Sequence, residues 1–324
     1  MQQNLPKTSA WRVTSSPHLR ARHSVSSIML DVIIALIPAG IAGVIIFGWR
    51  AAALIVISVA SAVMWEGLIQ KAMKRPVTIG DLSAVVTGLL LAYNLPVTAP
   101  LWLPVVGTAL AIILIKQCFG GLGQNFLNPA LGARAILLAS WTGLMSGSAF
   151  NAMVIGADAI SSATPLAASD ASAYPLWQLL LGNVPGCIGE TCKIALIAGG
   201  VYLIVRKVIS WRVPVTMLLT VFVLSWIYSG NIAGSVDSAL YQLLSGGLIL
   251  GAFFMATDYA STPVTPVGKL IMGVGAGLLV FIIRNFNDGY PEGCSYAILI
   301  MNLVTPLIDR FTQPKIYGEV KKHA

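Results

Sequence analysis

Long apolar runs alternate with short polar or glycine- and proline-rich connections along most of this chain. A typical run holds about 15 to 22 residues, close to the length that an α-helix needs to cross the hydrocarbon core of a bilayer. The runs lie at about 28–49, 51–69, 78–95, 101–117, 129–144, 194–208, 213–228, 238–257, 267–283 and 294–308. This pattern predicts an all-α integral membrane protein with about ten transmembrane helices.

Composition supports the same class. Of the 324 residues, 56% are hydrophobic and only 10% are charged, and the mean hydropathy is +0.82. A soluble domain would carry about a quarter charged residues. The first apolar run begins near Ile28 and lacks a small-residue cleavage pattern, so no cleavable signal peptide is expected. The net charge of +8 is scattered between apolar runs and forms no basic stripe, so no nucleic-acid partner is expected.

The basic residues are distributed unevenly over the connections, and this predicts the orientation of the chain. With a cytoplasmic N-terminus, all but three of the 20 Lys and Arg residues fall on the cytoplasmic side; the exceptions are Arg50, Lys193 and Arg284. Residues 1–27 and 313–324 are then cytoplasmic tails. The polar gap at 146–190, which contains no Lys or Arg, is predicted to be extracytoplasmic.

A weak internal repeat divides the membrane part into two halves, 28–145 and 191–312. The stretch Gly88–Pro100 is echoed by Gly247–Asp258 and by the Thr-Pro-Val-Thr-Pro that follows it. Five runs per half is an odd number, so the halves are predicted to be inverted relative to each other. Inverted repeats with interrupted segments at matching positions place a site between the halves in transporter-like folds.

The polar gap contains the stretch Asp158-Ala-Ile-Ser-Ser-Ala-Thr-Pro-Leu166, surrounded by Ser, Ala and Gly. Two interpretations of it are open on chemistry alone. The Thr164 hydroxyl, flanked by small residues, is an adequate attachment point for a bulky group. Alternatively, the stretch is an ordinary turn in which Ser or Thr caps a short helix that starts with Pro165.

The pattern D-x-x-S-x-A-T in this stretch resembles the flavinylation motif of the membrane subunits of the Rnf and sodium-pumping NADH:quinone reductase complexes. The resemblance implies that Thr164 carries FMN through a phosphoester bond made by a separate flavin transferase. Asp158, Ser161 and Ala163 match the rest of the motif, whereas Ser162 stands where the family commonly has glycine.

The resemblance covers nearly the whole chain, and the short N-terminal tail is closer to the D subunit of Rnf than to the longer B subunit of the quinone reductase. It implies a multi-pass protein of the cell membrane that carries electrons in a ferredoxin:NAD+ oxidoreductase coupled to Na+ or H+ translocation. The implied partners are the membrane A and E subunits, the flavin-bearing G subunit and the peripheral B and C subunits. A second, noncovalent flavin such as riboflavin is an option in this family, but no residue is assigned to it.

The predicted runs contain no histidine, which excludes haem ligation by histidine there. Cys187 and Cys192 either form a disulfide or remain thiols, and two thiols alone cannot complete a zinc or iron–sulfur site. The acidic residues at 31, 66, 81, 258 and 309 lie at or near run ends, so none is expected at the middle of the membrane.

Any ion path through the chain is therefore predicted to use backbone carbonyls and Ser, Thr and Asn groups. The candidates are Asn94, Thr98, Asn125, Thr257 and Thr262, each of which is also explained as a turn or cap residue. The interrupted stretches Tyr93–Pro100 and Thr257–Pro266 are predicted to face each other across the pseudo-twofold axis. In the alternative, both are surface turns at opposite membrane faces.

Two other functional classes remain open: a small-solute channel or transporter with an inverted repeat and no redox group, and a purely structural membrane scaffold. Neither needs a flavin, so a flavin on Thr164 separates both from the electron carrier.

Overall fold

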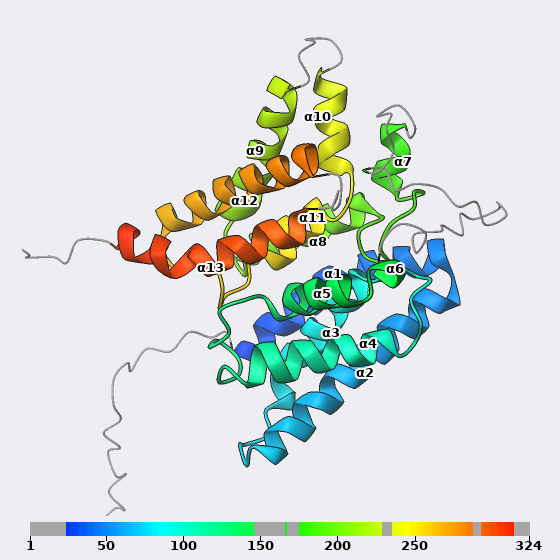
Figure 1. The fold of residues 1–324 in the computed structure, drawn as a ribbon, viewed down its shortest axis with the longest axis vertical. Helices are drawn as coiled ribbons and strands as arrows, with labels where there is room; N and C mark the ends of the chain where they lie inside the picture. The colour runs from blue at the N-terminus through cyan, green and yellow to red at the C-terminus, as the bar shows by residue number, and fades with distance from the viewer. Residues whose placement is uncertain (1–23, 146–165, 167–174, 229–234, 288–292, 314–324) are drawn as a thin grey trace, which may run out of the picture.

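A computed structural model of the chain describes residues 24–145, 166, 175–228, 235–287 and 293–313, and all regular structure in these ranges is helical (Figure 1). The first half contains α1 (Val25–Phe47), α2 (Trp49–Ala72), the 3-10 turn η1 (Ile79–Asp81), α3 (Ser83–Tyr93), α4 (Leu103–Ala109), the π-helical segment η2 (Leu110–Gln117), α5 (Pro129–Ser140) and α6 (Thr142–Met145). The connection between the halves contains α7 (Leu176–Leu181). The second half contains α8 (Lys193–Val205), α9 (Arg212–Tyr228), α10 (Ser235–Leu244), α11 (Leu248–Leu250), the π-helical segment η4 (Gly251–Met255), α12 (Pro266–Phe286) and α13 (Cys294–Thr312). Each predicted run coincides with helix, which confirms the all-α class.

Four helices, α1, α2, α12 and α13, are long and apolar enough to cross a membrane. The bent pair formed by α10 and α11–η4 makes a fifth candidate. The other apolar helices are shorter, at 10–17 residues. The structure therefore supports a multi-pass membrane protein, and the count of ten remains a prediction.

The apolar run 238–257 was expected to form one helix, but the structure divides it into two helical segments. The chain bends by 68° between α10 and α11, at the break Ser245–Gly247. Gly246 adopts a φ of 61°, a left-handed conformation that glycine tolerates. The carbonyl of Ser245 accepts from the Arg284 guanidinium at 3.0 Å, and that of Gly246 from Lys193 Nζ at 2.6 Å. Hydropathy did not predict the break because long apolar stretches flank Ser245–Gly247 on both sides.

The helices pack in matching pairs in the two halves. In the first half α2 packs against α3 and α4, and in the second half α9 packs against α10 and α12. The fourth run of each half forms α4–η2 and α12, and the fifth forms α5 and α13. In both halves these neighbours pack together, α5 against η2 and α13 against α12. Between the halves, α1 contacts α8 and α5 contacts α13 (Figure 1). Contacts between helices at equivalent positions are those expected of two related five-helix halves.

The helices present apolar side chains on their outer faces as well as inside. On α1, Ile34, Ile37, Ile41 and Ile45 are exposed, and the opposite face is buried. A helix that is apolar all round requires an apolar solvent on its outer face, which a bilayer supplies. The outer surface therefore agrees with a membrane location.

Contacts near the two ends of α1 distinguish the two ends of the helix bundle. Asp31, near the N-terminus of α1, forms an ion pair at 3.2 Å with Arg206, which lies at the C-terminal end of α8. The two helices are therefore antiparallel. The Asp31 end also holds the stretch 257–266, because the Tyr259 hydroxyl donates to the Val208 carbonyl. At the opposite end, the Arg50 end, the Arg50 guanidinium donates to the carbonyl of Thr98 at 3.2 Å.

Candidate functional site

The five residues of the predicted flavin motif, Asp158, Ser161, Ser162, Ala163 and Thr164, lie outside the described residues. The nearest described residue is Leu166. Its side chain packs at the break between α10 and α11, where its Cδ1 lies 2.6 Å from the position that a β-carbon on Gly246 would take. Lys193 donates to Gly246 from the N-terminus of α8, which places Leu166 at the Arg50 end of the bundle.

The five predicted ion-path residues are not brought together in one site, although Asn125 and Thr257 line the same cavity. Asn94 is buried at the centre of the bundle, whereas Thr98 is exposed at the Arg50 end. Thr257 and Thr262 lie at the Asp31 end, where their hydroxyls donate to the carbonyls of Phe253 at 2.6 Å and of Ala256 at 2.7 Å.

The two interrupted stretches therefore do not face each other along their length, and that expectation is wrong. Asn94 Nδ2 lies 3.8 Å from Sδ of Met255, which precedes the second stretch by two residues. The carbonyls expected to be free are bonded within the protein: Ile188 N–H donates to Leu95 at 3.1 Å and Gly189 N–H to Tyr93 at 3.0 Å.

A buried arginine joins the two halves at the centre of the bundle. Arg134 on α5 donates to Asn94 Oδ1 at 2.9 Å and to Ser295 Oγ, on α13, at 2.8 Å. Its other terminal nitrogen lies 3.9 Å from the sulfur of Cys187. Arg134 was counted among the cytoplasmic charges by the positive-inside rule, but only 6% of it is exposed and it binds both halves. It therefore carries no information about orientation.

Between α7 and α8, residues 184–191 form a loop that is buried along its whole length. It bonds to the end of α3 through Ile188 and Gly189, and Pro96 forms an antiparallel bridge with Cys187. Cys187 N–H donates to Glu190 Oε1 at 2.8 Å, whereas Glu190 Oε2 has no partner among the described residues. Cys187 and Cys192 are not joined by a disulfide in this structure.

A cavity that is partly open to solvent lies between the halves at the Asp31 end. Its apolar walls come from α1, α3, α8 and η4, and include Val32, Val86, Leu90, Leu203, Phe253 and Phe254. Its polar lining residues are Ser83, Thr87, Lys116, Asn125, Asn128, Thr257 and Asp258. Apolar walls with a few polar groups are typical of cofactor sites.

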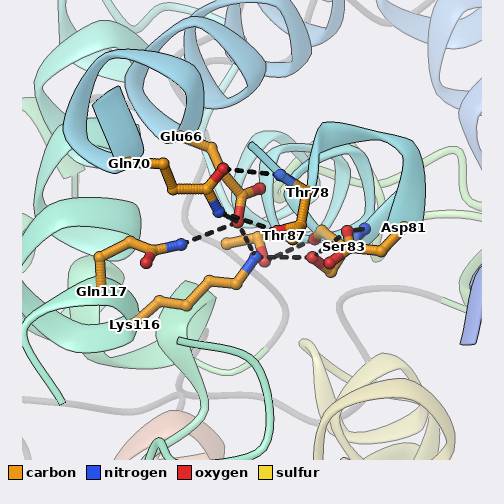
Figure 2. Close-up of polar contacts among 8 residues, drawn as sticks. All are labelled: Glu66, Gln70, Thr78, Asp81, Ser83, Thr87, Lys116 and Gln117. Atoms are coloured by element: carbon orange, nitrogen blue, oxygen red, sulfur yellow. Dashed lines mark hydrogen bonds and ion pairs between the residues drawn. The ribbon is translucent and has the colours of Figure 1, made fainter. Parts of the chain in front are cut away.

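One side of this cavity is backed by a cluster of polar side chains from α2, α3 and η2 (Figure 2). Lys116 Nζ donates to Glu66 Oε1 and to Ser83 Oγ, at 2.6 Å each. Glu66 Oε1 also accepts from Gln117 Nε2 at 2.9 Å, and Gln70 Nε2 lies 3.4 Å away. Glu66 and Lys116 are buried, with 0% and 2% exposed, and therefore require each other as charge partners.

The local fold of η2 brings two consecutive residues to one carboxylate. Lys116 and Gln117 end a π-helical segment, and the Gly121 N–H donates to Lys116 O with the wide i to i+5 spacing. A π-helix turns less per residue than an α-helix, so neighbouring side chains point in more similar directions. Such segments are frequent at functional sites.

This cluster was not predicted from the sequence. Glu66 was interpreted as one of several acidic residues at solvated run ends, and Lys116 as a cytoplasmic flanking charge. The signal was present, because both lie within apolar runs, at 51–69 and 101–117. A charge inside an apolar helix needs a partner on a neighbouring helix, and one of each sign was available.

Comparisons with known proteins cover nearly the whole chain. A family model described as the NQR2, RnfD, RnfE family matches residues 12–318. The D subunit of the Na(+)-translocating ferredoxin:NAD(+) oxidoreductase complex of Acetobacterium woodii is 51% identical over 320 residues, which is 96% of this chain and 97% of that protein. The D subunit of the proton-translocating complex of Clostridium ljungdahlii is 42% identical over 325 residues, with the same coverage. The D subunit of the ion-translocating oxidoreductase complex of Escherichia coli is 36% identical over 356 residues, with 96% and 99% covered.

Proposed function

Because this chain belongs to the NQR2, RnfD, RnfE family, we propose that it is the membrane electron carrier with covalent FMN on Thr164 in an ion-translocating ferredoxin:NAD+ oxidoreductase. The observation that carries this proposal is the similarity to D subunits along nearly the full chain. The D-x-x-S-x-A-T motif of this chain lies within residues 12–318, which the family model matches. The bound flavin supplies the redox chemistry by accepting and releasing electrons.

In this proposal the chain positions the flavin. Asp158, Ser161, Ser162 and Ala163 form the sequence that the flavin transferase recognises. Leu166, two residues after Thr164, packs at Gly246 and so holds the chain near the break between α10 and α11. Two residues of chain span at most about 7 Å, so this contact limits how far the attachment point can lie from the Arg50 end.

A second, noncovalent flavin such as riboflavin is proposed for the cavity at the Asp31 end. The aromatic and aliphatic walls suit a planar ring system, and the amide groups of Asn125 and Asn128 can donate and accept hydrogen bonds at its edge. The separation of this cavity from Leu166, at opposite ends of the bundle, suits a carrier that moves electrons across the membrane.

The transported ion is proposed to be Na+ or H+. The names of the relatives differ on this point, with Na+ for the A. woodii complex and protons for the C. ljungdahlii complex. Asn94, Thr257 and Thr262 remain candidates for contact with an ion, and so does Thr98 at the Arg50 end. Their separate positions exclude one site made of all four.

The chain is proposed to lie in the cell membrane with both termini and the Asp31 end in the cytoplasm. The distribution of Lys and Arg supports this orientation and puts residues 146–190 outside. The proposed partners are the membrane A and E subunits, the flavin-bearing G subunit, the peripheral B and C subunits, and the flavin transferase. Groups of three or more possible metal ligands are absent from the described residues, so electrons are proposed to enter and leave through these partners.

The test of covalent FMN uses ultraviolet fluorescence of the denatured full-length protein in a gel, after co-expression with the flavin transferase. The wild-type band is expected to fluoresce, and Thr164→Ala to remove the signal while membrane insertion persists. Ser161→Ala and Ser162→Ala remove neighbouring hydroxyls and are the matched controls, since their bands should still fluoresce if the hydroxyl of Thr164 is the acceptor. A fluorescent Thr164→Ala band would refute the site. A wild-type band without flavin would favour the channel or scaffold instead.

A further inference from the structure

We infer that Lys116 supplies the positive charge that stabilises a reduced ligand in the cavity at the Asp31 end, and that Glu66 holds Lys116 in place. This inference rests on the proposed function, in which that cavity takes a noncovalent flavin. It concerns a positioning role for two residues that the sequence interpretation left without one.

The ion pair is oriented with its positive end toward the cavity. Lys116 and Ser83 line the cavity, whereas Glu66 does not. The carboxylate lies behind the ammonium group and accepts from Lys116, Gln117 and Gln70 through one oxygen (Figure 2). Glu66 Oε2 has no partner among the described residues, so the carboxylate is held from one side only.

Two further acidic residues lie near the pair. Asp81 Oδ1 accepts from the hydroxyl and the N–H of Ser83, at 2.6 and 2.8 Å, so its charge is engaged with the N-terminus of α3. Asp258 lines the cavity itself and accepts from Ser261 at 3.2 Å. Burial raises the pKa of Asp258, which favours its neutral form. Lys116 is the one basic residue among the described residues that line the cavity. Its positive charge therefore faces the cavity without a charged acidic residue in the lining.

A buried ion pair is a poor source of stability, because removing both charges from water costs about as much as their attraction returns. The pair is accordingly assigned a functional role. An electron that reaches the cavity's ligand from a redox partner in the complex adds one negative charge to it. The nearby ammonium group stabilises that charge strongly because the surroundings are of low dielectric. No bond in this chain forms or breaks.

Opposite shifts of one potential test this inference. The measurement is the midpoint potential of riboflavin bound to the purified full-length protein in a Thr164→Ala background, where no covalent FMN contributes. Glu66→Gln leaves the ammonium charge unneutralised and is expected to raise the potential. The double variant Lys116→Gln, Glu66→Gln removes the oriented pair without leaving a bare carboxylate, and is expected to lower it. Lys116→Arg keeps the charge and is expected to stay close to the parent.

Arg50→Gln is the matched control, since it removes a basic residue that also donates hydrogen bonds within the protein but lies at the opposite end. Its potential should equal that of the parent. Unchanged potentials in Glu66→Gln and in the double variant, or shifts of the same sign in both, would overturn the inference. Failure of the parent protein to bind added riboflavin would also overturn it. The proposal of covalent FMN would survive that last result, because it is tested independently by comparing the gel fluorescence of the wild-type and Thr164→Ala bands.

Discussion

The backbone N–H of Gly189 donates to the carbonyl of Tyr93 at 3.0 Å, and the two residues are so close that a β-carbon on Gly189 would overlap the Tyr93 side chain. Gly189 belongs to the connection between the halves, and Tyr93 to the end of α3 in the first half. The Tyr93 hydroxyl in turn donates to Leu36 O on α1 at 2.8 Å. One glycine therefore lets the buried loop 184–191 reach the core of the first half.

Replacing Gly189 with Ala should lower the free energy of unfolding by about 1–3 kcal/mol, the usual cost of overpacking a filled core. The measurement is thermal unfolding in detergent, followed with a thiol-reactive dye. Cys118 and Cys192 are replaced with Ser because they are accessible in the folded protein, whereas Cys187 and Cys294 are buried until the fold opens. Gly143→Ala is the matched control, since nothing lies within 4 Å of its added carbon. Equal unfolding temperatures for the two variants would contradict the close approach.

Arg134 should be more important for stability than exposed arginines are. Arg134→Lys has no second terminal nitrogen to reach Cys187 and lacks the fixed geometry with which one guanidinium nitrogen bonds to Asn94 and Ser295. A hydrogen bond to a charged group contributes about 1.5–3 kcal/mol. A clear loss of thermal stability is expected, and Arg75→Lys, an exposed position, should show none. In a double-mutant cycle, Ser295→Ala should couple to Arg134→Lys by about 0.5–3 kcal/mol. Additive effects would argue against the shared contact.

The two ends of the bundle should be distinguishable by labelling. Thr98 lies at the Arg50 end and Val264, which is 81% exposed, at the Asp31 end. In a background without native cysteines, Thr98→Cys is expected to react with an impermeant thiol reagent in intact cells. Val264→Cys should react only after the membrane is opened. The reverse pattern would invert the proposed orientation, and labelling of both from one side would contradict the antiparallel packing of α1 and α8.

Stability should depend on pH through Asp258. Burial raises the pKa of its carboxyl, so the folded protein binds this proton more tightly than an unfolded chain does. The carboxyl therefore costs no stability below its ordinary pKa, and the cost grows as the pH rises toward the raised pKa. Asp258→Asn should stabilise the protein at pH 8 more than at pH 5, as measured by unfolding temperature. A gain that is equal at both values would show that the residue does not titrate in this way.

The class of the fold could be predicted from sequence because apolar run length is a direct consequence of bilayer thickness. The interior of the fold could not. The break at Ser245–Gly247 lies in an apolar run, and its stability depends on Lys193 and Arg284, which are distant in sequence. The buried loop 184–191 looked like a polar connection, because nothing local indicates that the end of α3 accepts its hydrogen bonds.

The candidate site was predictable only in part. The motif around Thr164 is a local signal, and it was found without any knowledge of packing. Glu66 and Lys116 are 50 residues apart, so their pairing depends on how α2 and η2 pack. Arg134 was misassigned for a related reason, because a charge near a run end looks the same whether it faces water or the interface between the halves.

The buried loop has a consequence for the order in which the protein matures on the ribosome. Helices α1 to α5 are synthesised first, yet the carbonyls of Tyr93 and Leu95 receive their partners only when the chain past Gly189 has emerged. In a nascent chain that stops after α6, these two carbonyls would lack hydrogen-bond partners at a position that is buried in the complete protein. The first half is thus expected to linger with the insertion machinery, or to be degraded by membrane proteases, until the second half arrives.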